Sequence, residues 1–168
     1  VQSANPETDF AGLAGELAAE VNIIDTHAII SCPPDQAESI RTKIKARAEL
    51  RIMSAGDAIE INKEVGLPGS VAERFDIPRL QGSHGIGHTR MATESAVTTL
   101  GAHPFSTGPD QCLVHNGSLS NHNSLRRKLA RQGGEVETEN DTEVAAAYLT
   151  WKMQQGANLG EALEAGID

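Results

Sequence analysis

The spacing of apolar and polar residues predicts alternating helices and strands in the first third of the chain. Residues 10–20 (FAGLAGELAAE) have a helical pattern, and 21–32 (VNIIDTHAIISC) are rich in β-branched residues, which favours strands. Two prolines end that run. A second helix is predicted over 35–49, where apolar residues recur on one face, and LRIMSA (50–55) predicts another strand. Together these form a compact β-α-β element.

Beyond residue 56 the spacing of apolar and polar residues follows no single period. Residues 57–66 and 70–75 favour short helices, with a turn between them, and HGIGHTRMAT (84–93) is a strand candidate. Residues 93–111 form a long polar stretch punctuated by glycine and proline, which predicts a loop. Loops of this length without regular structure are uncommon and are often functional.

The last third returns to regular patterns. Cys112-Leu113-Val114 is typical of a buried strand, and a helix over 121–133 ends in two glycines that suit a C-cap. A short strand at 135–138 precedes a helix over 142–156. The Asn140-Asp141 pair supplies side chains able to cap this final helix.

Composition and charge narrow the function classes. The 168 residues are 39% hydrophobic with 16 glycines, which is typical of a soluble domain with both helices and strands. A formal charge of −9 leaves no basic stripe for a phosphate backbone, so we expect no nucleic-acid partner. No apolar run reaches the length of a membrane span. Cys32 and Cys112 lie far apart and outside any CxxC spacing, which makes a cytoplasmic setting the default and a disulfide or zinc framework improbable.

Five of the six histidines lie between positions 84 and 122, which raises the possibility of a metal centre. His84 and His88 have i, i+4 spacing, but that spacing brings two ligands together only in a helix, and HGIGHTR does not have a helical pattern. No glutamate completes an HExxH motif. We therefore expect neither a metal nor a cofactor on this chain.

The segment QCLVHNGSLSNHN (111–123) has two interpretations. An apolar run ends in Asn116-Gly117, and Asn-Gly is the commonest hairpin dipeptide. An asparagine side-chain amide and a glycine backbone N–H at a strand end can also converge on one oxygen, as an oxyanion hole requires. The residues alone leave both interpretations open.

Two charged residues suggest a site for an amino acid. Arg90, flanked by Thr89 and Thr93, presents a guanidinium that can bind a carboxylate through two bonds or form a structural ion pair. Asp141 can cap a helix or bind an ammonium group. Together they would suit an α-amino acid, whereas His103, alone in the long loop, is more often structural than catalytic.

Four segments, taken in order, resemble the glutamine amidotransferases of the N-terminal-nucleophile type (type 2). They are GHTRMAT (87–93), GAHPFS (101–106), CLVHNGSLSNHNSLRRKL (112–129) and NDTEVAA (140–146). The ATESAVTT wording and the β-α-β element before it resemble, more narrowly, the amidotransferase-like subunit of N-methylglutamate synthase and glutamate synthase-like complexes.

The resemblance implies a role for each matched position. Arg90 matches the arginine that binds the glutamine α-carboxylate, and Thr93 of the same motif joins the substrate-binding set. Asp141 matches the acid that holds the α-ammonium group, and His103 matches the histidine that shapes the pocket. Asn116 and Gly117 match the oxyanion-hole pair.

The resemblance also implies a fold and partners. We expect an α+β protein that forms part of a four-layer αββα sandwich, with residues 1–80 carrying the inserted β-α-β element and 81–168 the core segment with the glutamine-site motifs. Expected partners are glutamine and a flavin-containing synthase subunit, which would receive the ammonia.

Three positions depart from the family pattern. Met91 and Glu94 replace residues that many relatives have in and after the arginine motif. The family's nucleophile is a cysteine at the start of the mature chain, whose own α-amine acts as the base, but the first residue here is Val1. We therefore expect an interior fragment of a longer amidotransferase. The alternative is a non-catalytic subunit that binds glutamine or glutamate or stabilises a synthase complex.

Overall fold

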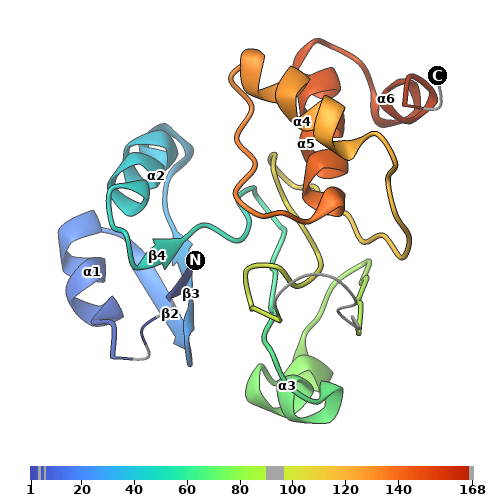
Figure 1. Ribbon diagram of the computed structural model, residues 1–168. Coiled ribbons are helices and arrows are strands. Elements are labelled where there is room, and N and C mark those ends of the chain that lie inside the picture. The colour runs from blue at the N-terminus through green and yellow to red at the C-terminus, as the bar shows by residue number, and fades with distance from the viewer. Residues whose placement is uncertain (4, 6, 90–96, 167–168) are drawn as a thin grey trace.

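The computed structural model describes residues 1–3, 5, 7–89 and 97–166, and it combines a small sheet with helices on both sides of a long irregular stretch (Figure 1). The strands are β1 (Gln2–Ser3), β2 (Glu20–Ile24), β3 (His27–Ser31) and β4 (Leu50–Arg51). The helices are α1 (Phe10–Leu17), α2 (Ala37–Lys45), α3 (Pro68–Arg74), α4 (His122–Arg131), α5 (Asp141–Gln154) and α6 (Leu159–Glu164), with short 3₁₀ turns η1 (Pro34–Gln36) and η2 (Ile77–Arg79). Among these helices none has the length and apolarity that a bilayer crossing needs.

The four strands lie in the order β2-β3-β1-β4, and each neighbouring pair is antiparallel. Strands β3 and β4 therefore run parallel to each other, with β1 between them and α2 as their connection. A two-residue turn joins β2 to β3, and Asp25 takes a φ of 55° there, which aspartate tolerates better than most residues. The strands and helix predicted between residues 21 and 55 are present, although the last strand covers two residues instead of six.

Helices α1 and α2 pack on one side of this sheet (Figure 1). Phe10, Leu13 and Leu17 from α1 meet Ile40 and Ile44 from α2, and all five are buried. The 3.6-residue period of these side chains explains why each helix has a single apolar face. This cluster holds the N-terminal part of the chain together.

Helices α4 and α5 form a second core around Leu129 and Val144, which are completely buried. Helix α4 ends in a Schellman motif: the Gly134 amide donates to the Leu129 carbonyl and the Gly133 amide to the Ala130 carbonyl, with Gly133 at a φ of 80°. The predicted glycine C-cap is confirmed.

Several short-range predictions are wrong. Residues 57–66 are not helical, because their amides and side chains bond to distant loops instead of to one another. Residues 84–89 and 135–138 form no strand, and the remainder of the 84–93 prediction lies outside the described residues. In the 112–114 run only Leu113 pairs, in a single bridge with Phe105. The four-layer sandwich stays a prediction, since the named strands described here belong to one small sheet.

Asp110 fixes the irregular segment that follows β4. Its carboxylate accepts hydrogen bonds from the amides of Asp57, Ala58 and Ile59 at 2.8, 2.9 and 3.1 Å. These donors hold the pKa of the Asp110 carboxyl below its usual value. The approach requires a glycine at position 56, where φ is 155° and an added Cβ would lie 2.3 Å from an Asp110 carboxylate oxygen.

Lys63 fixes the loop that contains His103. Its ammonium group is buried and donates to the carbonyls of Leu100, Ala102 and Pro104 at 3.1, 2.9 and 3.2 Å. It also lies 4.6 Å from the centroid of the Phe105 ring. Burial lowers the pKa of Lys63 to about 8, although the carboxylates of Glu143 and Glu137 act in the opposite direction. One buried cation thus binds three carbonyls of a five-residue stretch.

We predict that Gly56→Ala destabilises the fold by about 1–3 kcal/mol, because alanine is strained at this φ and its methyl group would collide with Asp110. Urea denaturation of the two proteins measures the difference. Gly15→Ala is the matched control: Gly15 lies in α1 with no atom near its added methyl, so this change should be neutral or stabilising. Equal stability of the two variants would contradict the structural role of Gly56.

We predict that Lys63→Met also destabilises the protein, by about 1–3 kcal/mol, because methionine fills the space but leaves three carbonyls without their donor. Denaturant unfolding, with NMR signals of His103 as a probe of the loop, measures the effect. Lys43→Met, on the exposed side of α2, is the control and should change neither. An undisturbed His103 signal in the Lys63 variant would show that this ammonium does not position the loop.

Candidate functional site

The first turn of α5 is the meeting point of three distant segments. His103, from the long loop, is buried, and its Nε2 lies 2.8 Å from Oγ1 of Thr142. Thr142 is 1% exposed and also lies near His115, whose Nδ1 is 3.5 Å from the same hydroxyl. At that distance the second contact is weaker than a normal hydrogen bond. One threonine hydroxyl therefore links the loop around 103 with the segment around 115.

Asp141 is not the cap of α5. Asn140 is the N-cap, and its side-chain oxygen accepts from the Thr142 amide at 2.9 Å. Asp141 is the first helical residue, and its Oδ2 accepts from the Leu119 amide at 2.7 Å. Capping is thus assigned to Asn140, and the half-buried Asp141 carboxylate ties the 115–119 segment to the helix.

Asn116 and Gly117 are both exposed, next to this junction. The His115 ring lies against Gly117 so closely that an added Cβ would be 2.7 Å from its Nε2. Neither Asn116 nor Gly117 has a positive φ, so they do not form the type I′ hairpin turn that the dipeptide favours. The hairpin interpretation of this dipeptide therefore does not hold, and the chain makes a bend at Gly117.

His88 packs against His103 from the segment that leads toward Arg90. The two rings are stacked, with centroids 4.5 Å apart and planes at 30°. Nδ1 of His88 is buried and has no hydrogen-bond partner among the described residues. Arg90 and Thr93 lie outside the described residues. This stack brings residue 88 against the His103 loop.

The remaining candidate residues have ordinary surroundings. Among the described residues, no group of three histidines, cysteines or carboxylates is placed to hold a metal ion. Cys112 is half-buried, and burial raises the pKa of its thiol, which makes it less reactive. His122 bonds through Nδ1 to the Leu119 carbonyl at 2.7 Å, at the start of α4.

Two residues of the site were not singled out from the sequence. Thr142 carries no charge and sits in an ordinary helix start, so no local signal marks it. Lys63 falls in a stretch that was predicted to be helical, between Asn62 and Glu64, so its surroundings in the sequence do not mark it either. Both act through partners that are about 40 residues away in the sequence.

His103 contacts Thr142 at the start of α5, and the neighbouring Asp141 accepts a hydrogen bond from the Leu119 amide. The Asp141 carboxylate and the buried His103 imidazole thus lie at the start of α5, and the exposed Asn116 and Gly117 come shortly before Leu119 in the chain. This combination can bind a polar molecule with a positive group at one end and an amide oxygen at the other.

Comparison with known proteins gives the family. A family model described as a glutamine amidotransferase domain matches residues 79–164, about half of the chain. The glutamine amidotransferase-like protein GlxB of Rhizobium meliloti is 60% identical over 174 residues, covering 100% of this chain and 58% of that protein. A putative glutamine amidotransferase of Methanothermobacter thermautotrophicus is 34% identical over 151 residues, covering 86% of this chain and 50% of that protein.

A third relative matches the chain over a much smaller part of its own length. The glutamine–fructose-6-phosphate aminotransferase of Vibrio vulnificus is 36% identical over 102 residues, which cover 61% of this chain and 17% of that protein. The chain thus spans between half and two thirds of the first two relatives and a small part of the third. The matched region contains every residue of the α5 junction described above. This chain belongs to the glutamine amidotransferase domain family.

Proposed function

We propose that this chain carries the glutamine-binding and oxyanion-stabilising part of an amidotransferase that releases ammonia from glutamine. The observation that supports the proposal most is the junction at the start of α5, where His103 and Asp141 meet the segment that contains Asn116 and Gly117. These residues span about 40 positions of the sequence, and their counterparts in the family bind a single substrate, glutamine.

Each residue has a role in this proposal. The Asp141 carboxylate holds the α-ammonium group of glutamine, and the Arg90 guanidinium holds the α-carboxylate through two parallel bonds. Thr93 completes the substrate-binding set, and His103, fixed by Thr142 and by Lys63 through its loop, shapes the pocket. The Asn116 amide and the Gly117 N–H, both exposed, donate to the oxygen of the side-chain amide.

The proposed reaction needs a thiolate. The sulfur attacks the side-chain amide carbon, the oxygen becomes an oxyanion, and the C–N bond breaks as the nitrogen takes up a proton and leaves as ammonia. Water then hydrolyses the thioester to glutamate and restores the thiol. Cys32 and Cys112 are internal residues without a free α-amine, so neither provides the thiolate and base together. The whole protein would supply that cysteine.

The proposal extends to fold and partners. The four-layer sandwich of N-terminal-nucleophile enzymes is the fold in which we place this chain, and a flavin-containing synthase subunit, of the kind found in N-methylglutamate synthase and glutamate synthase-like complexes, is the proposed acceptor of the ammonia. The motif order of the chain and the amidotransferase domain match support the proposed fold, and the ATESAVTT wording with the β-α-β element before it supports the proposed partner.

A second candidate is a subunit that binds glutamine without hydrolysing it. Such a subunit would keep the residues that match the substrate-binding motifs and would lack the catalytic thiol, a role that neither Cys32 nor Cys112 fills, since both are internal to the chain. The pocket would then serve as a sensor or as a stabilising surface in a synthase complex.

The first experiment measures the mass and the N-terminal residue of the whole mature protein, together with glutamate release from glutamine. We expect an N-terminal cysteine and a glutaminase activity that an alkylating agent abolishes. Glutamine binding without turnover, in a protein that begins with another residue, would replace the catalytic proposal with the binding one. Absence of glutamine binding would overturn both.

We predict that Asn116→Ala in the whole protein lowers kcat by about 10²–10³-fold with little change in KM, because an oxyanion donor acts mainly in the transition state. Arg90→Ala should instead raise KM first, since it removes a bond to the bound substrate. Asn123→Ala, on the exposed side of α4, is the control and should leave both constants unchanged. A large KM effect of Asn116→Ala at constant kcat would contradict the oxyanion role.

A further inference from the structure

The segment 114–118 contains Asn116, the only asparagine of the sequence that is followed by glycine. Asn116 and Gly117 are both exposed. The Leu119 amide, just after the segment, is fixed by its bond to Asp141. Between these points no backbone group of 114–118 forms a hydrogen bond with another described residue. The backbone around Asn116 is therefore not held by a ladder, a helix or a turn.

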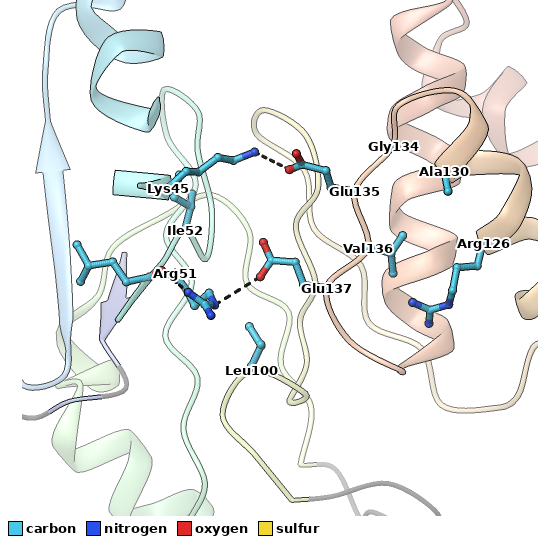
Figure 2. Close-up of a pocket in the computed structure, with 11 residues that line it drawn as sticks. Lys45, Arg51, Ile52, Leu100, Arg126, Ala130, Gly134, Glu135, Val136 and Glu137 are labelled. Atoms are coloured by element: carbon cyan, nitrogen blue, oxygen red, sulfur yellow. Dashed lines mark hydrogen bonds and ion pairs between the residues drawn. The ribbon is translucent and has the colours of Figure 1, made fainter. Parts of the chain in front are cut away.

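The irregular segment on the other side of α4 is held more firmly. Residues 134–137 line a cavity of about 800 Å³, together with side chains of α2 and β4 (Figure 2). Lys45 and Arg51 form ion pairs across this cavity with the two glutamates of that segment, at 2.5 and 3.7 Å. Residues 116–118 line no part of this cavity and have no hydrogen bond to another described residue. Of the two segments that flank α4, the one with Asn116 is thus the less restrained.

The missing side chain at Gly117 matters for the chemistry of Asn116. An added Cβ would lie 2.7 Å from Nε2 of His115, so a larger residue would have to displace this ring. Glycine also leaves its own nitrogen unshielded and gives the backbone more conformational freedom than any other residue. Both properties allow the Gly117 nitrogen to approach the amide carbon of the preceding side chain.

That approach permits an intramolecular reaction, favoured because both groups belong to one chain. The Gly117 nitrogen gives its proton to a base and attacks Cγ of Asn116, and the new C–N bond closes a succinimide ring. The bond from Cγ to Nδ2 breaks, and Nδ2 takes up a proton and leaves as ammonia. Water then opens the ring at Cγ, which gives aspartate, or at the backbone carbonyl carbon, which gives isoaspartate. Water is the only other reactant.

We propose that Asn116 is a site of spontaneous deamidation, which converts its exposed amide into a carboxylate and so inactivates the glutamine site. The effect on activity rests on the proposed function, in which the Asn116 amide and the Gly117 N–H donate to the oxyanion. A carboxylate has no hydrogen to donate, and its charge repels the charge that develops on the oxygen. The isoaspartate product also lengthens the backbone before Gly117 and thus displaces the second donor.

Incubation of the whole protein in mildly alkaline buffer, followed by peptide mapping with mass spectrometry, tests the modification. Asn116 should convert to aspartate and isoaspartate several times faster than Asn123, an exposed asparagine that is followed by serine. The rate should rise with pH, because the nucleophile is the deprotonated Gly117 nitrogen. An unmodified Asn116, or equal rates at the two positions, would overturn the proposal. Aspartate without isoaspartate would overturn it too, since that product indicates direct hydrolysis.

Asn116→Gln is the matched variant. Its longer side chain keeps an amide but closes the corresponding ring far more slowly, so position 116 should stay unmodified while Asn123 behaves as in the original protein. Conversion of the variant at the original rate would refute the succinimide route.

A separate glutaminase assay tests the consequence. Activity of the original protein should fall in step with the loss of unmodified Asn116, because a molecule without this donor turns glutamine over about 10²-fold more slowly or worse. Full activity after complete conversion would refute the inactivation. If the fresh protein has no glutaminase activity, the proposed function fails, whereas the mass measurement still decides the modification.

Discussion

The hydrogen bond between His103 and the Thr142 hydroxyl is the contact on which the arrangement of the site depends. It joins a loop without regular structure to the most regular helix of the chain, and it does so inside the protein, where water does not compete. The Asp141–Leu119 bond, one residue away, adds the third segment. The start of a helix can connect several segments in this way, because its first amides have no hydrogen-bond partner within the helix and are free to bind other groups.

The loop around His103 is held from the other side by the ammonium group of Lys63. Three carbonyls share this one donor, while the carboxylate of Glu143, itself buried, binds the amides of Glu137 and Thr138. Side chains of opposite charge thus fix two irregular segments, residues 100–104 and 137–138. Irregular backbone needs such partners, since it has no ladder of its own to satisfy its polar groups.

Local patterns predicted the regular elements well and the irregular ones badly. The apolar period located α1, α2, α4 and α5, and the closing glycines of α4 gave the Schellman motif, because both signals depend on residues within one or two turns. Residues 57–66 were also predicted to be helical. Their amides donate to Asp110 and the Lys63 side chain donates to carbonyls of residues 100–104, so no helix forms. Asn116-Gly117 likewise lacks the positive φ that a type I′ hairpin turn needs.

The sequence by itself determined the family, the helices with a clear period, and the identity of the residues that match the glutamine-site motifs. Only the tertiary structure decided that Asn140 caps α5 while Asp141 binds Leu119, that Thr142 links His103 to His115, and that Lys63 lies beneath the loop. The physical reason is range. Periodicity and capping follow from neighbouring residues, whereas a buried polar contact depends on which distant donor reaches an acceptor once the two cores have packed.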